Sequence, residues 1–248
     1  INLYDGKKLS LPNIEKLDSV TKGDHEARAD LRNFLSSRFD QGRGLASVKS
    51  HAAAYARVHG LMSCEKLFDI SDEPQYIKDM YGPTQFAEQT IMARRMVEAG
   101  VPFVRVSRAW WDSHGQNFET HLEMVPELDR VLSALIDDLK QRGMLEDTLV
   151  VTMGEFGRTP KINGSLGRDH FATAWSASLH GGRTVSGAVY GKTDAKGERV
   201  VEGEIGAGEM FATILEAAGI DHKREYHVGA RPIPLVNPGI KPVTELIT

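Results

Sequence analysis

The spacing of apolar side chains predicts helices for much of the first hundred residues. Within the first forty residues, one helical side carries Leu31, Phe34, Leu35 and Phe39. Residues 45–68, which include Ala52, Ala53, Ala54 and Ala56, suggest a second helix. A third helical face ends at Gly100, a residue type favoured just after a helix. Its apolar members are Phe86, Ile91, Met92, Met96 and Val97.

From residue 101 onward the pattern alternates between strands and helices. Residues 101–106 and 148–153 read as strands, and a long amphipathic helix over 118–142 separates them. The second of these strands is apolar on both faces, which is typical of a sheet covered by helices on each side. A further strand is expected at 174–179 and a further helix at 208–218. Strand, helix and strand in succession indicate a βαβ unit.

The sequence therefore predicts an α/β fold with a helical region packed at its N-terminal side. We expect a mostly helical region over residues 1–83 and an α/β region over residues 84–248. Only three or four strands are legible, which is few for this class of fold.

Composition and charge narrow the classes of function. The chain has 248 residues with 30 Lys+Arg against 34 Asp+Glu, giving a net charge of -4, so no basic field favours nucleic acid. Cys64 is the single cysteine, which excludes an intrachain disulfide framework. No apolar run reaches the roughly 20 residues of a membrane span, and no signal-peptide pattern opens the chain.

Two loops that follow predicted strands carry candidate chemistry. Residues 110–115 contain Asp112 and His114, and residues 154–160 contain Glu155. In open α/β sheets, ligands bind beyond the carboxyl ends of the strands, so these loops are expected at one edge. Carboxylates and imidazoles together suit Zn²⁺ or Mn²⁺. The pattern predicts a metal site there.

A third segment, residues 167–170, adds His170 before a strand. Structural roles stay open for all of these groups. Asp112 is also a candidate helix cap and His114 a partner for a buried carbonyl. Glu155 is equally placed to pair with Arg158, and the adjacent acid and imidazole of the third segment could form an ordinary ion pair.

Other polar and aromatic residues are given structural roles. The pair Arg94 and Arg95 is expected on a solvated helix face, with one of them able to reach an anion. Packing in the loop is expected for Trp110 and Trp111, and His121 could point toward the site or away from it. The remaining histidines are predicted to be solvated or in the core, and the single thiol is expected to be inert.

Five segments carry a resemblance to a known family. They are residues 93–101, 111–114, 154–160, 167–170 and 187–194. In order and content they resemble the bacterial family known as domain of unknown function 1501, a branch of the alkaline phosphatase and sulfatase superfamily. The resemblance implies an alkaline phosphatase-like three-layer sandwich, present in part. Residues 84–248 would then be the half of that domain that carries the metal site.

The superfamily also implies a chemistry. Its members hold two divalent metals and hydrolyse phosphate or sulfate esters through a nucleophile. By motif, Asp112, His114, Glu155 and His170 resemble the metal ligands, with zinc as the first choice and manganese, magnesium or calcium as others. Two arginines, Arg158 and Arg168, would hold the oxygens of the anion through their forked donors.

The chain departs from the superfamily pattern in three places. The spacing between Asp112 and His114 is shorter than in related phosphatases, and Phe156 stands where a ligating histidine usually follows the acid. The early strand that bears the nucleophile has no counterpart. Together with Ile1 in place of an initiating methionine, this leads us to expect the C-terminal portion of a larger protein, partnered by the N-terminal remainder of that protein.

Two classes of function follow from the resemblance. The first is a metal-dependent hydrolase of sulfate or phosphate esters, acting on a small-molecule or glycan ester, with a nucleophile that this sequence does not identify. The second is a non-catalytic metal- or ligand-binding domain on the same fold, which Phe156 favours. An exported or periplasmic location is expected from the family alone.

Overall fold

The computed structural model describes residues 17–41, 43 and 46–248. Contacts divide the chain into two units. One consists of Ile1–Asp79 with Pro83–Val106, and the other of Met80–Gly82 with Ser107–Thr248. The main division thus follows Val106, whereas the sequence suggested a boundary after residue 83.

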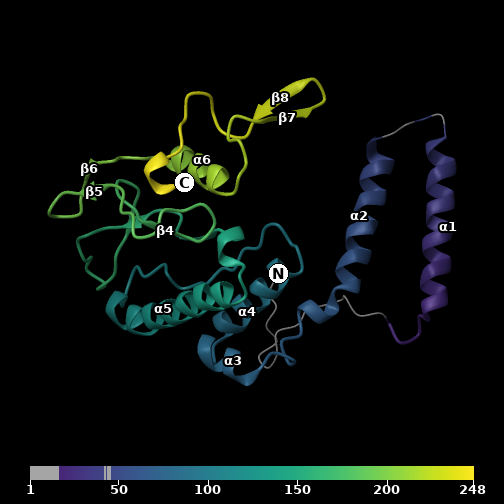
Figure 1. The fold of residues 1–248 in the computed structure, drawn as a ribbon, viewed down its shortest axis with the longest axis horizontal. Coiled ribbons are helices and arrows are strands. Elements are labelled where there is room, and N and C mark those ends of the chain that lie inside the picture. The colour runs from purple at the N-terminus through teal and green to yellow at the C-terminus, as the bar shows by residue number, and fades with distance from the viewer. Residues whose placement is uncertain (1–16, 42, 44–45) are drawn as a thin grey trace. The chain divides into compact units, whose positions relative to one another are not determined.

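The first unit is helical in its described part. Its helices are α1 (Lys22–Asp40), α2 (Ala46–Ser63), the short η1 (Glu65–Leu67), most of α3 (Gln75–Tyr81) and α4 (Gln85–Glu98). A capping box at Thr21 and Asp24 begins α1, which runs beside α2 (Figure 1). The predicted helices are therefore present, with α4 beginning after the capping residue Thr84.

The predicted strand over residues 101–106 is wrong: this segment has no strand partner in the described chain. Pro102 cannot donate a hydrogen bond to a ladder, and the side chain of Phe103 is left 80% exposed. An extended segment becomes a strand only where another backbone completes its hydrogen bonds. The expected βαβ unit therefore does not form from these residues.

The second unit contains the described strands and the longest helix. After α5 (Asn117–Gln141) and the short η2 (Leu145–Asp147) come four two-stranded antiparallel pairs, then a final short helix η3 (Thr244–Leu246). The pairs are β1 (Val150–Met153) with β4 (Ala177–His180), β2 (Gly157–Arg158) with β3 (His170–Phe171), β5 (Lys192–Thr193) with β6 (Val200–Glu202), and β7 (Glu225–Val228) with β8 (Arg231–Pro234). Helix α6 (Ala207–Ala217) lies between β6 and β7 in the chain.

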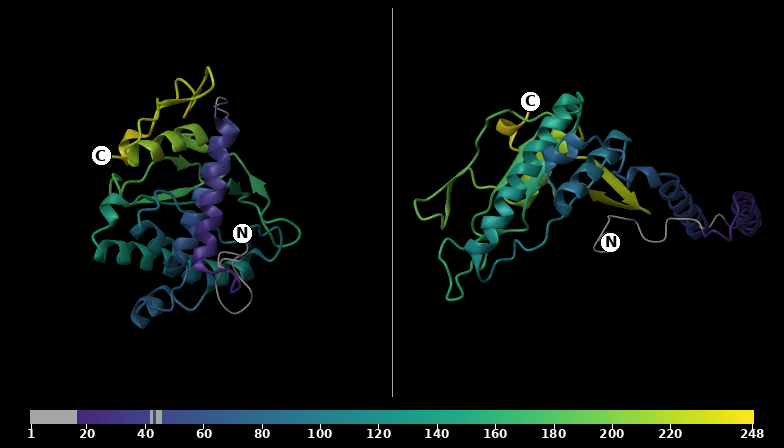
Figure 2. Two further views of the ribbon diagram at one scale, coloured as in Figure 1. Left: turned by 90° about the vertical axis from the view of Figure 1, so that its right-hand side faces the viewer. Right: turned by 90° about the horizontal axis from the view of Figure 1, so that it is seen from below.

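The pair β1 and β4 is layered between two helices. Its register runs from Val150 opposite His180 to Met153 opposite Ala177. Two views place this pair between α5 on one side and α6 on the other (Figures 1 and 2). The predicted strand at 148–153 and the predicted helices at 118–142 and 208–218 are thus confirmed, while the pairing is antiparallel rather than the parallel arrangement of a βαβ unit.

The core of this unit comes from the inner faces of its helices. Fully or almost fully buried apolar side chains are Met124, Val131, Ala134, Leu139, Met210, Ala212 and Ala217. Buried polar groups find partners: the hydroxyl of Tyr81 donates to Asp138 at 3.0 Å, and Arg142 donates to the same carboxylate at 2.6 Å. No helix in the described part of the chain combines the length and apolar character needed to cross a bilayer.

Candidate metal centre

The loop before α5 presents Asp112 and His114 to solvent. Ser113 lies between them, is 4% exposed, and donates its hydroxyl to the side-chain oxygen of Asn117 at 3.0 Å. Trp110 and Gln116, at the two ends of the loop, adopt left-handed φ values of 76° and 51°. A side chain in this region costs about 1–3 kcal/mol unless the surroundings hold it, and such positions gather at functional sites. The inward serine turns its two neighbours outward.

The segment between β2 and β3 is hydrogen-bonded to this loop. The side-chain amide of Asn163 donates to the backbone oxygen of His114 at 3.0 Å and to Asp169 at 2.9 Å. Its oxygen accepts from two backbone N–H groups, those of Ser165 and Gly167. A Cβ at Gly167 would collide with the backbone of His114, so this approach requires glycine. The two loops therefore form one rigid frame.

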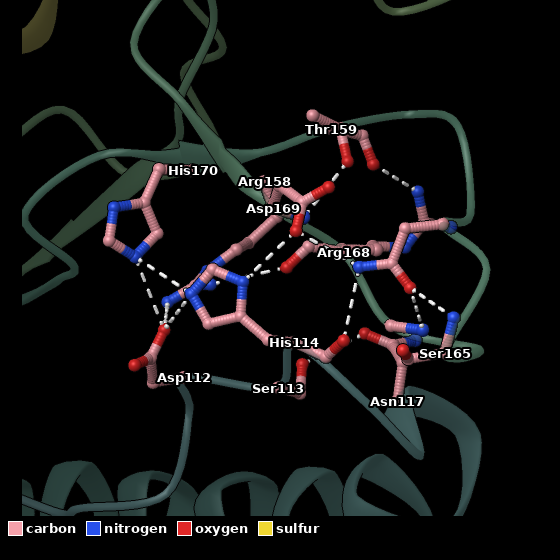
Figure 3. Close-up of polar contacts among 12 residues, drawn as sticks. Asp112, Ser113, His114, Asn117, Arg158, Thr159, Ser165, Arg168, Asp169 and His170 are labelled. Carbon is pink, nitrogen blue, oxygen red and sulfur yellow. Dashed lines mark hydrogen bonds and ion pairs between the residues drawn. The ribbon is translucent and has the colours of Figure 1, made fainter.

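Three ligand atoms converge at the centre of this frame, which we call the triad: Asp112, His114 and His170 (Figure 3). His114 Nε2 lies 3.0 Å from Asp112 Oδ1 and 3.1 Å from His170 Nε2. His170 Nε2 lies 3.3 Å from the same carboxylate oxygen. The three side chains are 64%, 47% and 53% exposed, in chain order. The site is open to solvent on one side.

A fourth residue, Asp169, orients His114 from behind. Its Oδ1 lies 3.0 Å from His114 Nδ1 and also accepts from Asn163 (Figure 3). A neutral imidazole carries one N–H, so donation from Nδ1 to this carboxylate leaves a lone pair on Nε2. That lone pair points into the triad. A metal-ligating histidine is usually supported in this way, with a carboxylate on one ring nitrogen and the metal on the other.

Arg158 holds the carboxylate of the triad. Its guanidinium donates to Asp112 Oδ1 at 2.6 Å and to the backbone oxygen of Arg168 at 3.2 Å. Hydrogen bonds from Arg158 first, and then from His170, lower the pKa of Asp112 below its ordinary value of 3.8. The pKa of Asp169 is lowered in the same way by His114 and Asn163. Both acids are therefore ionised at neutral pH, as metal ligation and histidine orientation require.

The dimensions of the triad fit a small divalent cation. A tetrahedral zinc site with bonds of about 2.0–2.2 Å has ligand atoms about 3.3–3.6 Å apart. The three separations here, 3.0, 3.1 and 3.3 Å, need only small side-chain shifts to reach that spacing. Three protein ligands with solvent at the fourth position are the arrangement found in catalytic rather than structural zinc sites.

Glu155, the fourth predicted ligand, lies outside the triad. It lines a cavity of about 630 Å³ together with residues such as Trp175 and Phe211. The ring of the next residue, Phe156, packs against the ring of His170 at an angle of 39°, with 4.1 Å between centroids. The aromatic ring therefore occupies the side of His170 that a fourth ligand from this loop would need.

The remaining predicted residues have structural contacts. The guanidinium of Arg168, predicted to bind the anion, donates to the backbone oxygens of Thr159 and Pro160, both at 2.6 Å, which closes the loop. The ring of His121 packs against Trp111 with 5.5 Å between centroids rather than joining the triad. Of the two predicted anion-binding arginines, Arg158 alone borders the triad.

Asp169 and Asn163 were missed as site residues from the sequence. The signal for Asp169 is its place beside His170, because a metal-ligating histidine usually needs a carboxylate partner. In the structure this carboxylate pairs with the other histidine, His114. A second group of possible ligands, Glu216, Asp221 and His222, was missed as well. There His222 Nδ1 lies 2.5 Å from Glu216, which lowers the pKa of this glutamate and ties the chain after α6 to the helix.

Comparison with protein families decides the wider relationship. Residues 3–247 match the family described as protein of unknown function, DUF1501. The chain belongs to this family. Searches of curated proteins and of solved structures found no match to the chain. Membership of DUF1501 assigns no activity, so function must be argued from the triad.

Proposed function

We propose that this DUF1501 protein is a metal-dependent hydrolase of sulfate or phosphate esters. The observation that carries the proposal is the convergence of Asp112 Oδ1, His114 Nε2 and His170 Nε2, with Asp169 behind one imidazole. The resemblance of its motifs to the alkaline phosphatase and sulfatase superfamily supports the same reading. Zinc is the first candidate cation, because two imidazoles and a carboxylate suit it.

The contacts of the triad give the cation and each neighbouring side chain a separate role in the proposed reaction. A divalent cation at the triad would neutralise charge on the ester's oxygens and lower the pKa of a coordinated water. Asp169 fixes the tautomer of His114, and Arg158 holds Asp112 ionised. The Arg158 guanidinium also borders the centre, so its planar donors are placed to contact an anionic ester.

The nearest hydroxyls are engaged elsewhere. Ser113 is buried and directed at Asn117, and the Thr159 hydroxyl donates to the backbone oxygen of Lys161 while accepting from the backbone N–H of Asp169. A serine or threonine nucleophile would have to be free and to face the triad. The proposal therefore assigns neither residue as the nucleophile.

A non-catalytic metal- or ligand-binding domain is the second candidate. The specific observation in its favour is the ring of Phe156 against His170, at a place where superfamily relatives carry a ligating histidine. An aromatic ring there leaves three ligands for one cation and no second metal. Binding without turnover is what this alternative requires.

Metal content and turnover together separate the two candidates. The protein is purified without chelator, its metal is measured by elemental analysis, and the apoprotein is titrated with Zn²⁺ by calorimetry. Hydrolysis of nitrophenyl sulfate, nitrophenyl phosphate and a panel of alkyl and glycan esters is then followed with and without the cation, on the full-length protein.

The hydrolase proposal expects about one cation per chain and cation-dependent release of nitrophenol. His170→Ala should abolish both, and His121→Ala, which alters a histidine outside the triad, should change neither. Stoichiometric metal without hydrolysis of any ester in the panel selects the binding domain. Absence of bound metal, with no heat of zinc binding, contradicts the hydrolase and the metal-binding form of the second candidate, and leaves only a domain that binds another ligand.

A further inference from the structure

The metal centre leaves one cavity of the second unit unexplained, the cavity that Glu155 lines. Its volume is about 630 Å³, within the range of pockets that hold a small molecule. Its walls come from the segment after β1, from the first two turns of α6, and from residues 235–240 near the chain's end. All of these lie in the second unit.

The cavity walls are mostly apolar and open to water. Met153 and Phe211 line it, yet they are 52% and 48% exposed. The indole of Trp175 and the side chain of Ile240 add to the same surface. Binding of an apolar ligand in a concave site is favourable when it removes such apolar side chains from water.

One charged residue, Glu155, lines this cavity in the described chain. A single carboxylate among apolar walls repels a second anion and attracts a cation or a hydrogen-bond donor. The preferred occupant therefore has an apolar body and a hydroxyl or amine, without an acidic group of its own.

Two chain segments connect the cavity to the triad. Glu155 lines the cavity, and the ring of the next residue, Phe156, packs against the ring of His170 in the triad. Five residues after His170, Trp175 returns to the cavity wall. A Cβ at Gly157 would collide with the backbone oxygen of Ala174, so the two segments are pressed together between cavity and triad.

We propose that this cavity binds the organic group of the ester, so that the protein acts on sulfate or phosphate monoesters of apolar aromatic or alkyl alcohols. The assignment of the cavity as a substrate site rests on the proposed hydrolase function. The cavity itself selects neutral or cationic apolar groups, and Glu155 sets that selection.

Direct binding tests the cavity without any turnover. Phenylbutylamine, phenylbutanol and phenylbutyrate share an apolar body and differ in charge, and each is titrated into the full chain by calorimetry. We expect the amine to bind most tightly, the alcohol next and the carboxylate at least about tenfold more weakly than the amine. Equal affinities for all three, or no binding of the amine at millimolar concentration, would overturn the proposal.

Two variants assign the binding to the cavity. Glu155→Gln removes the charge with little change of shape and should reduce the preference for the amine over the alcohol several-fold. The matched control, Glu202→Gln on an exposed strand, should leave this preference unchanged. Ala207→Trp, at the exposed start of α6, should fill the cavity and weaken all three ligands tenfold or more with an unchanged circular dichroism spectrum. Wild-type affinity in Ala207→Trp would place the ligands elsewhere and refute the site.

The triad separates this inference from the proposed function. In His170→Ala the amine should still bind, because the cavity does not use that imidazole, while hydrolysis is lost. Amine binding together with absence of metal would defeat the hydrolase and leave the cavity as a ligand site. Hydrolysis of methyl sulfate as fast as phenylbutyl sulfate would defeat the assignment of the cavity to the ester's organic group and leave the hydrolase standing.

Discussion

Two clusters of charged and ionisable side chains, one in each unit, differ in their burial. In the first unit, Arg94 and Glu73 are 1% and 6% exposed and form an ion pair of 2.7 Å. Burial alone would raise the pKa of Glu73, but hydrogen bonds from Arg94 and Arg95 outweigh it and lower the pKa. In the second unit, all three side chains of the triad are about half exposed or more.

The difference shows how to tell a structural cluster from a chemical one. The buried pair is a cation matched to an anion, so its charges cancel within the protein. The triad brings an anion and two imidazole nitrogens to one point where water has access, and apart from Arg158 at its edge it holds no side-chain cation. Mutations should therefore affect stability at the first place and ligand binding at the second.

The largest effect is expected from Arg94→Ala. Glu73 would lose its buried partner and keep the more exposed Arg95, and breaking a buried ion pair costs about 3–5 kcal/mol. Urea unfolding followed by circular dichroism measures this loss. Lys22→Ala, which breaks the exposed pair of Lys22 with Glu26, is the control and should change the free energy of unfolding by less than about 0.5 kcal/mol. Equal losses in the two variants would contradict the distinction drawn here.

The second effect concerns the triad itself. Asp112→Asn and His170→Ala should each lower zinc affinity by at least about a hundredfold. The free energy of unfolding of the apoprotein should change little, because exposed groups contribute little to the core. Calorimetric zinc titration and urea unfolding measure the two quantities. If Asp112→Asn clearly destabilises the folded protein but leaves its zinc affinity intact, the triad is a structural cluster like the first.

A smaller effect is expected behind the triad. Asp169→Asn keeps a hydrogen-bond acceptor for His114 but removes the charge, and loss of such a supporting carboxylate typically costs about 10–100-fold in metal affinity. The zinc titration again measures it. Asp194→Asn, an acid of the second unit that pairs only with nearby backbone N–H groups, serves as the matched control and should bind zinc as the wild type does.

The smallest effect is the pH dependence of stability. Since the folded-state pKa values of Asp112 and Asp169 lie below 3.8, the stabilisation from these acids is fully present above about pH 4 and is lost as the pH falls through the lowered pKa. Unfolding measured between about pH 5 and pH 2 should show a shallower acid loss in Asp112→Asn than in the wild type. A steeper loss in the variant would mean that the contacts of this acid do not favour its ionised form.

Hydrophobic spacing predicted much of the local structure, with residues 101–106 as an exception. Helices α4, α5 and α6 and strand β1 lie where the apolar periodicity placed them, since each is decided by which side chains share a face. The residue types also marked Asp112, His114 and His170 as candidate ligands, together with Glu155, which lies outside the triad. Local pattern and chemical type are properties of neighbouring residues, which is why the chain itself carries them.

Tertiary structure alone decided which strands pair and which side chains contact each other. Residues 101–106 have strand-like spacing but form no strand ladder with the described residues, and β1 pairs antiparallel with β4, which spacing cannot specify. The arginine expected in solvent, Arg94, is buried because Glu73 from another segment neutralises it. Glu155 turns to the cavity and Asp169 to His114 for the same reason. Burial and ligation depend on groups far apart in the chain, and folding is what brings those groups together.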